Sequence, residues 1–135
     1  MKTKITGAGS LLGLILFITI ALAGCAGDRL VGTWDVTSFE MQQPGQQGVR
    51  VQSIGTITFN SDQTGTKNIR YSVLDRQFTD TLSFNWSKSE GYITLEGPGS
   101  EFAKAWIVVD DDRTTQRWRS TDGENTVQLL ELKKR

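Results

Sequence analysis

Apolar and polar side chains alternate along most of the chain beyond residue 30. Ile69, Tyr71 and Val73 are separated by single polar residues, and the same period of two runs through Trp34 and Val36. A period of two places alternate side chains on opposite faces of a β-strand, one face buried and one in water. No stretch beyond residue 30 keeps an apolar period of 3.6 over ten residues, so we expect little helix.

The alternating segments predict eight strands separated by turns rich in Gly, Pro, Asn and Asp. The expected strands are residues 31–40, 50–60, 65–73, 77–86, 91–96, 102–110, 114–120 and 125–133. Eight short strands joined by hairpins favour an all-β fold, an eight-stranded antiparallel up-and-down β-barrel, because closure leaves no sheet edge exposed. A two-sheet β-sandwich fits the same pattern and is the alternative.

The first 24 residues have the features of a signal peptide. Lys2 and Lys4 precede an apolar segment, residues 11–23, which as a helix would span about 20 Å, less than the ~30 Å hydrocarbon core of a membrane. The segment ends in Leu22-Ala23-Gly24-Cys25, which resembles the lipobox of bacterial lipoproteins. This resemblance implies cleavage before Cys25 and lipidation of its thiol. An ordinary secretory signal or an uncleaved anchor is the alternative.

The lipobox divides the chain into a signal peptide (1–24), a lipidated cysteine with a short tether (25–29) and one domain (30–135). Buried acyl chains contribute about 0.8 kcal/mol per CH₂, so several chains on Cys25 predict stable attachment to a membrane. Ala26 stands where the resemblance would place Asp in a lipoprotein of the inner membrane. We therefore expect a lipid-anchored protein of the bacterial cell envelope, at the outer membrane.

Charge and residue content exclude several kinds of chemistry. The chain has 15 basic and 15 acidic residues, and 13 basic residues remain without Lys2 and Lys4, so it lacks the basic excess typical of nucleic-acid binding. It has no His and one Cys, which excludes Ser-His and Cys-His catalysis, His/Cys zinc sites and an intrachain disulfide. Asp110-Asp111-Asp112, with Glu101 nearby, contains no Gly to turn a calcium loop, and we interpret it as a solvated turn. We expect no catalytic residue, metal or cofactor.

Three motifs along the chain carry a family resemblance. Leu30-Val31-Gly32-Thr33-Trp34-Asp35-Val36 resembles the Gly-x-Trp signature of lipocalins, and more closely the small lipocalin-like domains of bacterial lipoproteins. The segments Thr56-Ile57-Thr58-Phe59-Asn60-Ser61-Asp62 and Glu131-Leu132-Lys133 are similar to a hairpin and a final strand of those domains. The chain departs from full lipocalins because it is shorter and has no Thr-Asp-Tyr motif.

This resemblance implies a structural role for Gly32 and Trp34 at the base of the barrel. A large flat ring closes that end, and a glycine two residues before it allows another segment to approach closely. In lipocalins a basic residue from a late strand often covers this tryptophan. Arg117 and Arg119 are the candidates for this cation–π contact.

The strand pattern also predicts which side chains point into the barrel. The inward set comprises Val36, Ile57, Phe59, Ile69, Tyr71, Phe78, Leu82, Phe84, Trp86, Trp106 and Trp118. We take Tyr71, Phe78, Leu82, Phe84, Trp86, Trp106 and Trp118 as candidates to line a ligand cavity, although the same residues would also fill a small barrel. Asp80 and Lys104 share this parity, and each would need a partner or a place at an open rim.

Two functions remain open from the sequence. The first is a binding module that holds a small apolar or amphipathic molecule in the cell envelope. The second is a solid barrel that acts as an interaction or inhibitor protein through its loops, with the Gln- and Gly-rich loop 42–48 as the first candidate. In both cases we expect a monomer attached to the membrane through Cys25.

Overall fold

A computed structural model describes residues 29–121 and 125–135. The predicted signal peptide and Cys25 lie outside the described residues. In the described part, no helix has the length and apolarity needed to cross a membrane. The core side chains run from Leu30 to Leu132, so a chain that begins at Ala26 retains every core contact described below.

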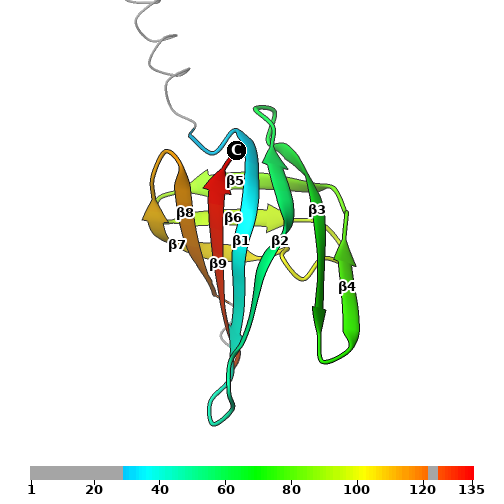
Figure 1. Ribbon diagram of the computed structural model, residues 1–135. Helices are drawn as coiled ribbons and strands as arrows, with labels where there is room; N and C mark the ends of the chain where they lie inside the picture. The colour runs from blue at the N-terminus through cyan, green and yellow to red at the C-terminus, as the bar shows by residue number, and fades with distance from the viewer. Residues whose placement is uncertain (1–28, 122–124) are drawn as a thin grey trace, which may run out of the picture.

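Nine strand segments form one closed antiparallel barrel (Figure 1). They are β1 (Gly32–Gln42), β2 (Val49–Phe59), β3 (Thr64–Val73), β4 (Arg76–Asp80), β5 (Phe84–Ser89), β6 (Tyr92–Glu96), β7 (Ala105–Asp111), β8 (Thr115–Ser120) and β9 (Val127–Lys134). The order is β2-β1-β9-β8-β7-β6-β5-β3-β4, and a β2–β3 pairing closes the ring. The predicted eight-stranded barrel is confirmed, and the sandwich alternative is wrong.

Segments β4 and β5 together make one interrupted barrel strand. Ile69 pairs with Asp80 and Gly65 pairs with Phe84, so both segments keep a single register along β3. The Oδ1 atom of Asp80 accepts the amide N–H of Leu82 at 3.1 Å, and this local turn lifts the chain away from β3. The expectation of one continuous strand over 77–86 is therefore wrong.

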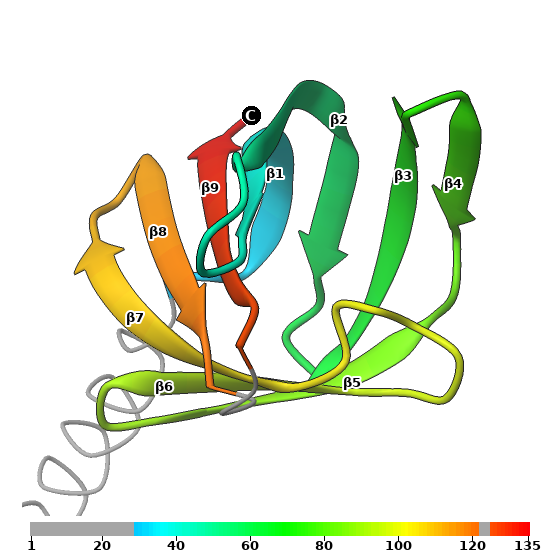
Figure 2. The ribbon, with the colours of Figure 1, turned by 90° about the horizontal axis from the view of Figure 1, so that it is seen from below.

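The two ends of the barrel are distinct. The start of β1, the C-terminus and the β2–β3 turn lie at one end, which we call the base (Figure 1). The β1–β2 and β3–β4 hairpins and the β6–β7 loop, residues 97–104, lie at the other end, which we call the mouth (Figure 2). Strand β7 begins at Ala105, not at the expected residue 102, because residues 102–104 belong to this loop.

Aromatic rings fill the interior towards the base. The Phe59 ring lies 5.5 Å from Phe84, 5.6 Å from Trp86 and 6.0 Å from Trp118, measured between ring centroids. A Cβ atom added to Gly65 would lie 2.2 Å from the Phe84 ring, so the absence of a side chain at Gly65 makes room for that ring. This half of the barrel is a packed core.

A close approach between β2 and β3 depends on Gly55. Its φ is +141°, and an added Cβ would lie 1.9 Å from the carbonyl oxygen of Asn68. The neighbouring β1 strand changes register between Val36 and Ser38, which marks a β-bulge opposite this point. Glycine thus permits the sharp bend that closes the barrel here.

Candidate ligand-binding site

Trp34 closes the base of the barrel. Its side chain is fully buried, and its indole N–H donates to the carbonyl oxygen of Leu30 at 2.8 Å. The Nζ atom of Lys134 lies 5.4 Å from the ring centroid, and a Cβ on Gly32 would lie 3.1 Å from Lys134 Cε. The close approach expected at Gly32 is therefore made by a lysine of β9.

Lys134, rather than Arg117 or Arg119, covers Trp34. Alternation along β8 turns Trp118 inward and both arginines outward. Arg117 forms ion pairs on the outer surface with Asp110 at 3.2 Å and Glu131 at 3.3 Å. The expectation that either arginine stacks on Trp34 is wrong.

The seven candidate lining residues occupy three different environments. Phe84, Trp86, Trp106 and Trp118 are buried in the packed core. Leu82 is 45% exposed, contrary to the expected inward orientation, because it lies in the break between β4 and β5. Tyr71 and Phe78 lie partly buried at the mouth, with their rings stacked at 4.9 Å and 13°. Of the seven, these two therefore border an accessible space at the mouth.

The β6–β7 loop folds over the mouth and inserts Phe102. This side chain is 1% exposed, and its ring centroid lies 5.0 Å from that of Phe39 on β1. The indole N–H of Trp106 donates to the carbonyl oxygen of Phe102 at 3.0 Å, which holds the loop in place. The loop is therefore packed against the barrel through Phe102.

A buried ion pair ties this loop to the barrel wall. The Nζ atom of Lys67 lies 3.0 Å from Oδ2 of Asp80, and the two side chains are 1% and 12% exposed. Lys67 also donates to Oγ of Ser100 at 2.6 Å, and the Ser100 hydroxyl donates to Asp80 at 2.7 Å. Asp80 thus has the partner that its burial requires. Sequence reasoning missed Lys67, although it shares its strand parity with Ile69 and Tyr71.

A second polar network surrounds Glu101. Its two carboxylate oxygens accept from the Tyr71 hydroxyl at 3.3 Å and from Nε2 of Gln128 at 3.0 Å, while Lys104 Nζ donates to Oε1 of Gln128. Burial, followed by the charge of Glu101, raises the pKa of Tyr71 well above its usual value. The phenol is therefore protonated at neutral pH. Lys104, expected at a rim or beside a ligand, lies 5.5 Å from the Trp106 ring.

A small hollow remains at the mouth beside the loop. Its volume is about 170 Å³, and its lining residues are Tyr71, Phe78, Thr79, Asp80, Gly99, Glu101 and Phe102. We call it the mouth hollow. It combines an apolar wall of aromatic rings with two carboxylates that come from different elements. This composition suits a small ligand with both an apolar and a polar part.

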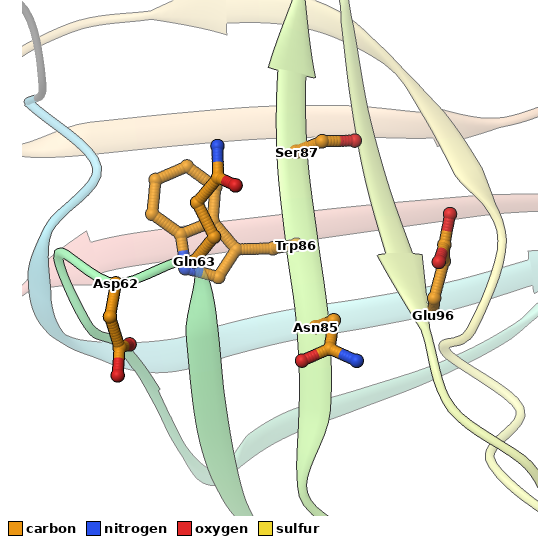
Figure 3. A pocket seen from close by; sticks show the side chains of 6 residues that line it. All are labelled: Asp62, Gln63, Asn85, Trp86, Ser87 and Glu96. Atoms are coloured by element: carbon orange, nitrogen blue, oxygen red, sulfur yellow. The ribbon is translucent and has the colours of Figure 1, made fainter.

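A second hollow lies on the outer wall (Figure 3). Its volume is about 290 Å³, and it is lined by Asp62, Gln63, Asn85, Trp86, Ser87 and Glu96. Hydrogen bonds from the Thr64 hydroxyl and amide lower the pKa of Asp62, and the Trp86 indole N–H donates to two backbone carbonyls. Because all the lining residues except Trp86 are polar and exposed, this hollow offers little to an apolar ligand.

The Asp110–Asp112 cluster is distributed over the barrel surface. Asp110 pairs with Arg117, and Asp111 lies 3.3 Å from Lys88. A hydrogen bond from Gln116 lowers the pKa of Asp111. Glu101 belongs to the mouth instead. Within residues 29–121 and 125–135, no three His, Cys, Asp or Glu side chains come together as metal ligands.

Comparison with known protein families agrees with this architecture. The family model described as the lipocalin-like domain matches residues 30–116. The chain therefore belongs to the lipocalin-like domain family. No curated protein matches the sequence.

Proposed function

We propose that this chain is a lipid-anchored lipoprotein of the bacterial cell envelope that acts as a small-molecule binding module. The ligand is a small apolar or amphipathic molecule that enters the mouth hollow. The lipocalin-like family of the chain supports a binding role, and the lipobox sequence that ends at Cys25 supports the anchor. The outer membrane is the expected location, because Ala26 and not Asp follows the cysteine.

The observation that carries the binding proposal is the mouth hollow itself. The stacked Tyr71 and Phe78 rings form its apolar wall, while Asp80 and Glu101 supply polar atoms. Aromatic walls with a few placed polar groups are typical of small-molecule sites. The packed rings nearer the base restrict the ligand to this end.

Native mass spectrometry of a chain from Ala26 to Arg135, purified without detergent, tests the binding proposal. We expect a stoichiometric added mass that is lost on denaturation. Phe78→Ala should abolish it, because the variant removes one of the two stacked rings of the apolar wall. Tyr92→Ala is the matched control, since Tyr92 is an exposed aromatic residue on the outer surface. An unmodified apo mass that persists after incubation with envelope lipid extracts contradicts the proposal.

The anchor has a separate test. The full chain should fractionate with membranes and incorporate labelled palmitate, and Cys25→Ser should abolish the labelling. Labelling that survives the substitution would exclude Cys25 as the acylated residue.

The packed interior favours a second candidate, an interaction protein with a solid barrel. Residues 43–48 of the β1–β2 hairpin are exposed at the mouth end, where Gln43 donates to Thr126 at 3.0 Å. Replacing 43–48 with a two-residue turn should abolish cross-linking to an envelope protein. Cross-linking that is unchanged by the replacement contradicts this role for the loop.

A further inference from the structure

We propose that the mouth hollow selects a cationic head group, that of an amphipathic amine or quaternary ammonium compound. This inference rests on the proposed binding function and specifies the ligand class for the same site. It depends on the charge of the lining, the aromatic rings and the size of the hollow.

The lining carries unbalanced negative charge. Asp80 is matched by Lys67, but Glu101 accepts only from two neutral donors, Tyr71 and Gln128. Among the described residues, no salt bridge includes Glu101, and no Lys or Arg lines the hollow. The ammonium group of Lys104 is held by the Gln128 side chain and does not line the hollow. A positive group that enters therefore meets one carboxylate outside any salt bridge, whereas an anion would meet two carboxylates.

The aromatic wall favours the same kind of ligand. Tyr71 and Phe78 both line the hollow, and aromatic faces attract ammonium groups through their quadrupole. Because the Tyr71 phenol stays protonated and donates to Glu101, the ring is neutral and holds the carboxylate at the edge of the hollow. A carboxylate beside aromatic rings is complementary to an alkylammonium group.

The size of the hollow limits it to a head group. Its volume of about 170 Å³ is below the ~300–1,000 Å³ of pockets that enclose a whole drug-sized ligand. Leu82 is 45% exposed beside it, since a Cβ added to the lining residue Gly99 would lie 3.5 Å from Leu82 Cδ1. An alkyl tail that leaves the hollow can therefore cover this exposed leucine.

Calorimetric titration of the Ala26–Arg135 chain tests the inference with three probes of equal tail length. Decyltrimethylammonium, 1-decanol and decyl sulfate are compared below their aggregation concentrations. We expect the cation to bind at least about fivefold more tightly than either other probe. This ratio corresponds to roughly 1 kcal/mol of binding free energy from one partly exposed charge pair. Glu101→Gln keeps an acceptor for Tyr71 but removes the charge, and should weaken cation binding about fivefold.

Control variants separate the possible results. Glu96→Gln removes an exposed carboxylate outside the mouth hollow and should leave cation binding unchanged. Equal binding of all three probes, weakened by Phe78→Ala, would overturn the charge selection and leave the proposed function standing. Cation binding that Glu101→Gln does not weaken would also overturn it. If none of the probes binds, both the selection and the proposed binding function fail.

Discussion

The buried pair of Lys67 and Asp80 gives the sharpest test of the fold at the mouth. Lys67→Met keeps most of the length of the side chain but removes its charge. Asp80 would then retain Ser100 and the Leu82 amide as partners but lose the cation 3.0 Å away. A carboxylate that is only 12% exposed would then have to keep its charge without this partner.

The expected cost follows from distance and burial. Two unit charges 3.0 Å apart attract by roughly 5 to 6 kcal/mol at an effective dielectric constant of about 20. Removing one partner of a buried pair typically costs about 3–5 kcal/mol. Because Asp80 keeps some access to solvent, we expect the lower end, about 3 kcal/mol in the free energy of unfolding.

Urea unfolding at neutral pH, followed by tryptophan fluorescence, measures this cost. Trp34, Trp86, Trp106 and Trp118 all lie in the barrel core and report its loss. The double variant Lys67→Met/Asp80→Asn should be at least about 1 kcal/mol more stable than additivity predicts, because no buried charge is left without a partner.

The control is Lys133→Met, which removes an exposed lysine and should change stability by less than about 0.5 kcal/mol. A similarly small effect of Lys67→Met, together with additivity in the double variant, would refute the reasoning.

Three further predictions concern the rest of the barrel. Gly55→Ala should cost more than about 3 kcal/mol or prevent folding, as measured by thermal circular dichroism, because its Cβ would overlap the β3 backbone at a φ of +141°. Lys134→Met should lower the free energy of unfolding by about 1 kcal/mol through loss of the contact with Trp34, as measured in urea. The pKa of Asp111 is lowered in the folded state, so its contribution to stability is present above its unfolded pKa and is lost as pH falls through the folded pKa. Stability measured from pH 5 to pH 2 should therefore fall less steeply for Asp111→Asn; an unchanged slope would contradict this.

The barrel was predictable because its main signal is local. Alternation in segments such as 65–73 reports which face of a strand is buried, and closure follows from the number of strands. The same alternation marks Lys67 as inward. Its partner Asp80, however, is brought to it by the β3–β4 hairpin. The break in the strand coincides with the hydrogen bond that the Asp80 carboxylate accepts from the Leu82 amide.

The mouth was less predictable because it depends on contacts between distant segments. Gly97-Pro98-Gly99-Ser100 indicates a turn, but nothing nearby indicates that Phe102 folds back against Phe39. The identity of the cation that contacts Trp34 depends in the same way on strand register, since Trp34 pairs directly with Lys134 across β1 and β9. Sequence patterns give the strand faces, whereas these contacts require the assembled barrel.

The two ends of the barrel give the proposed anchor and the proposed ligand site separate places. Arg29 is four chain steps from Cys25, and an extended chain spans at most about 3.5 Å per step, so acylation would hold the base within about 14 Å of the membrane surface. Arg29 is fixed at that end, because its carbonyl oxygen accepts from Lys134 at 2.9 Å. The mouth hollow is lined by residues of β3, β4 and the β6–β7 loop. The β3–β4 hairpin lies at the end opposite the base (Figure 1). Under the proposed anchoring, a ligand would therefore reach the hollow from the aqueous side and not directly from the bilayer beneath the base.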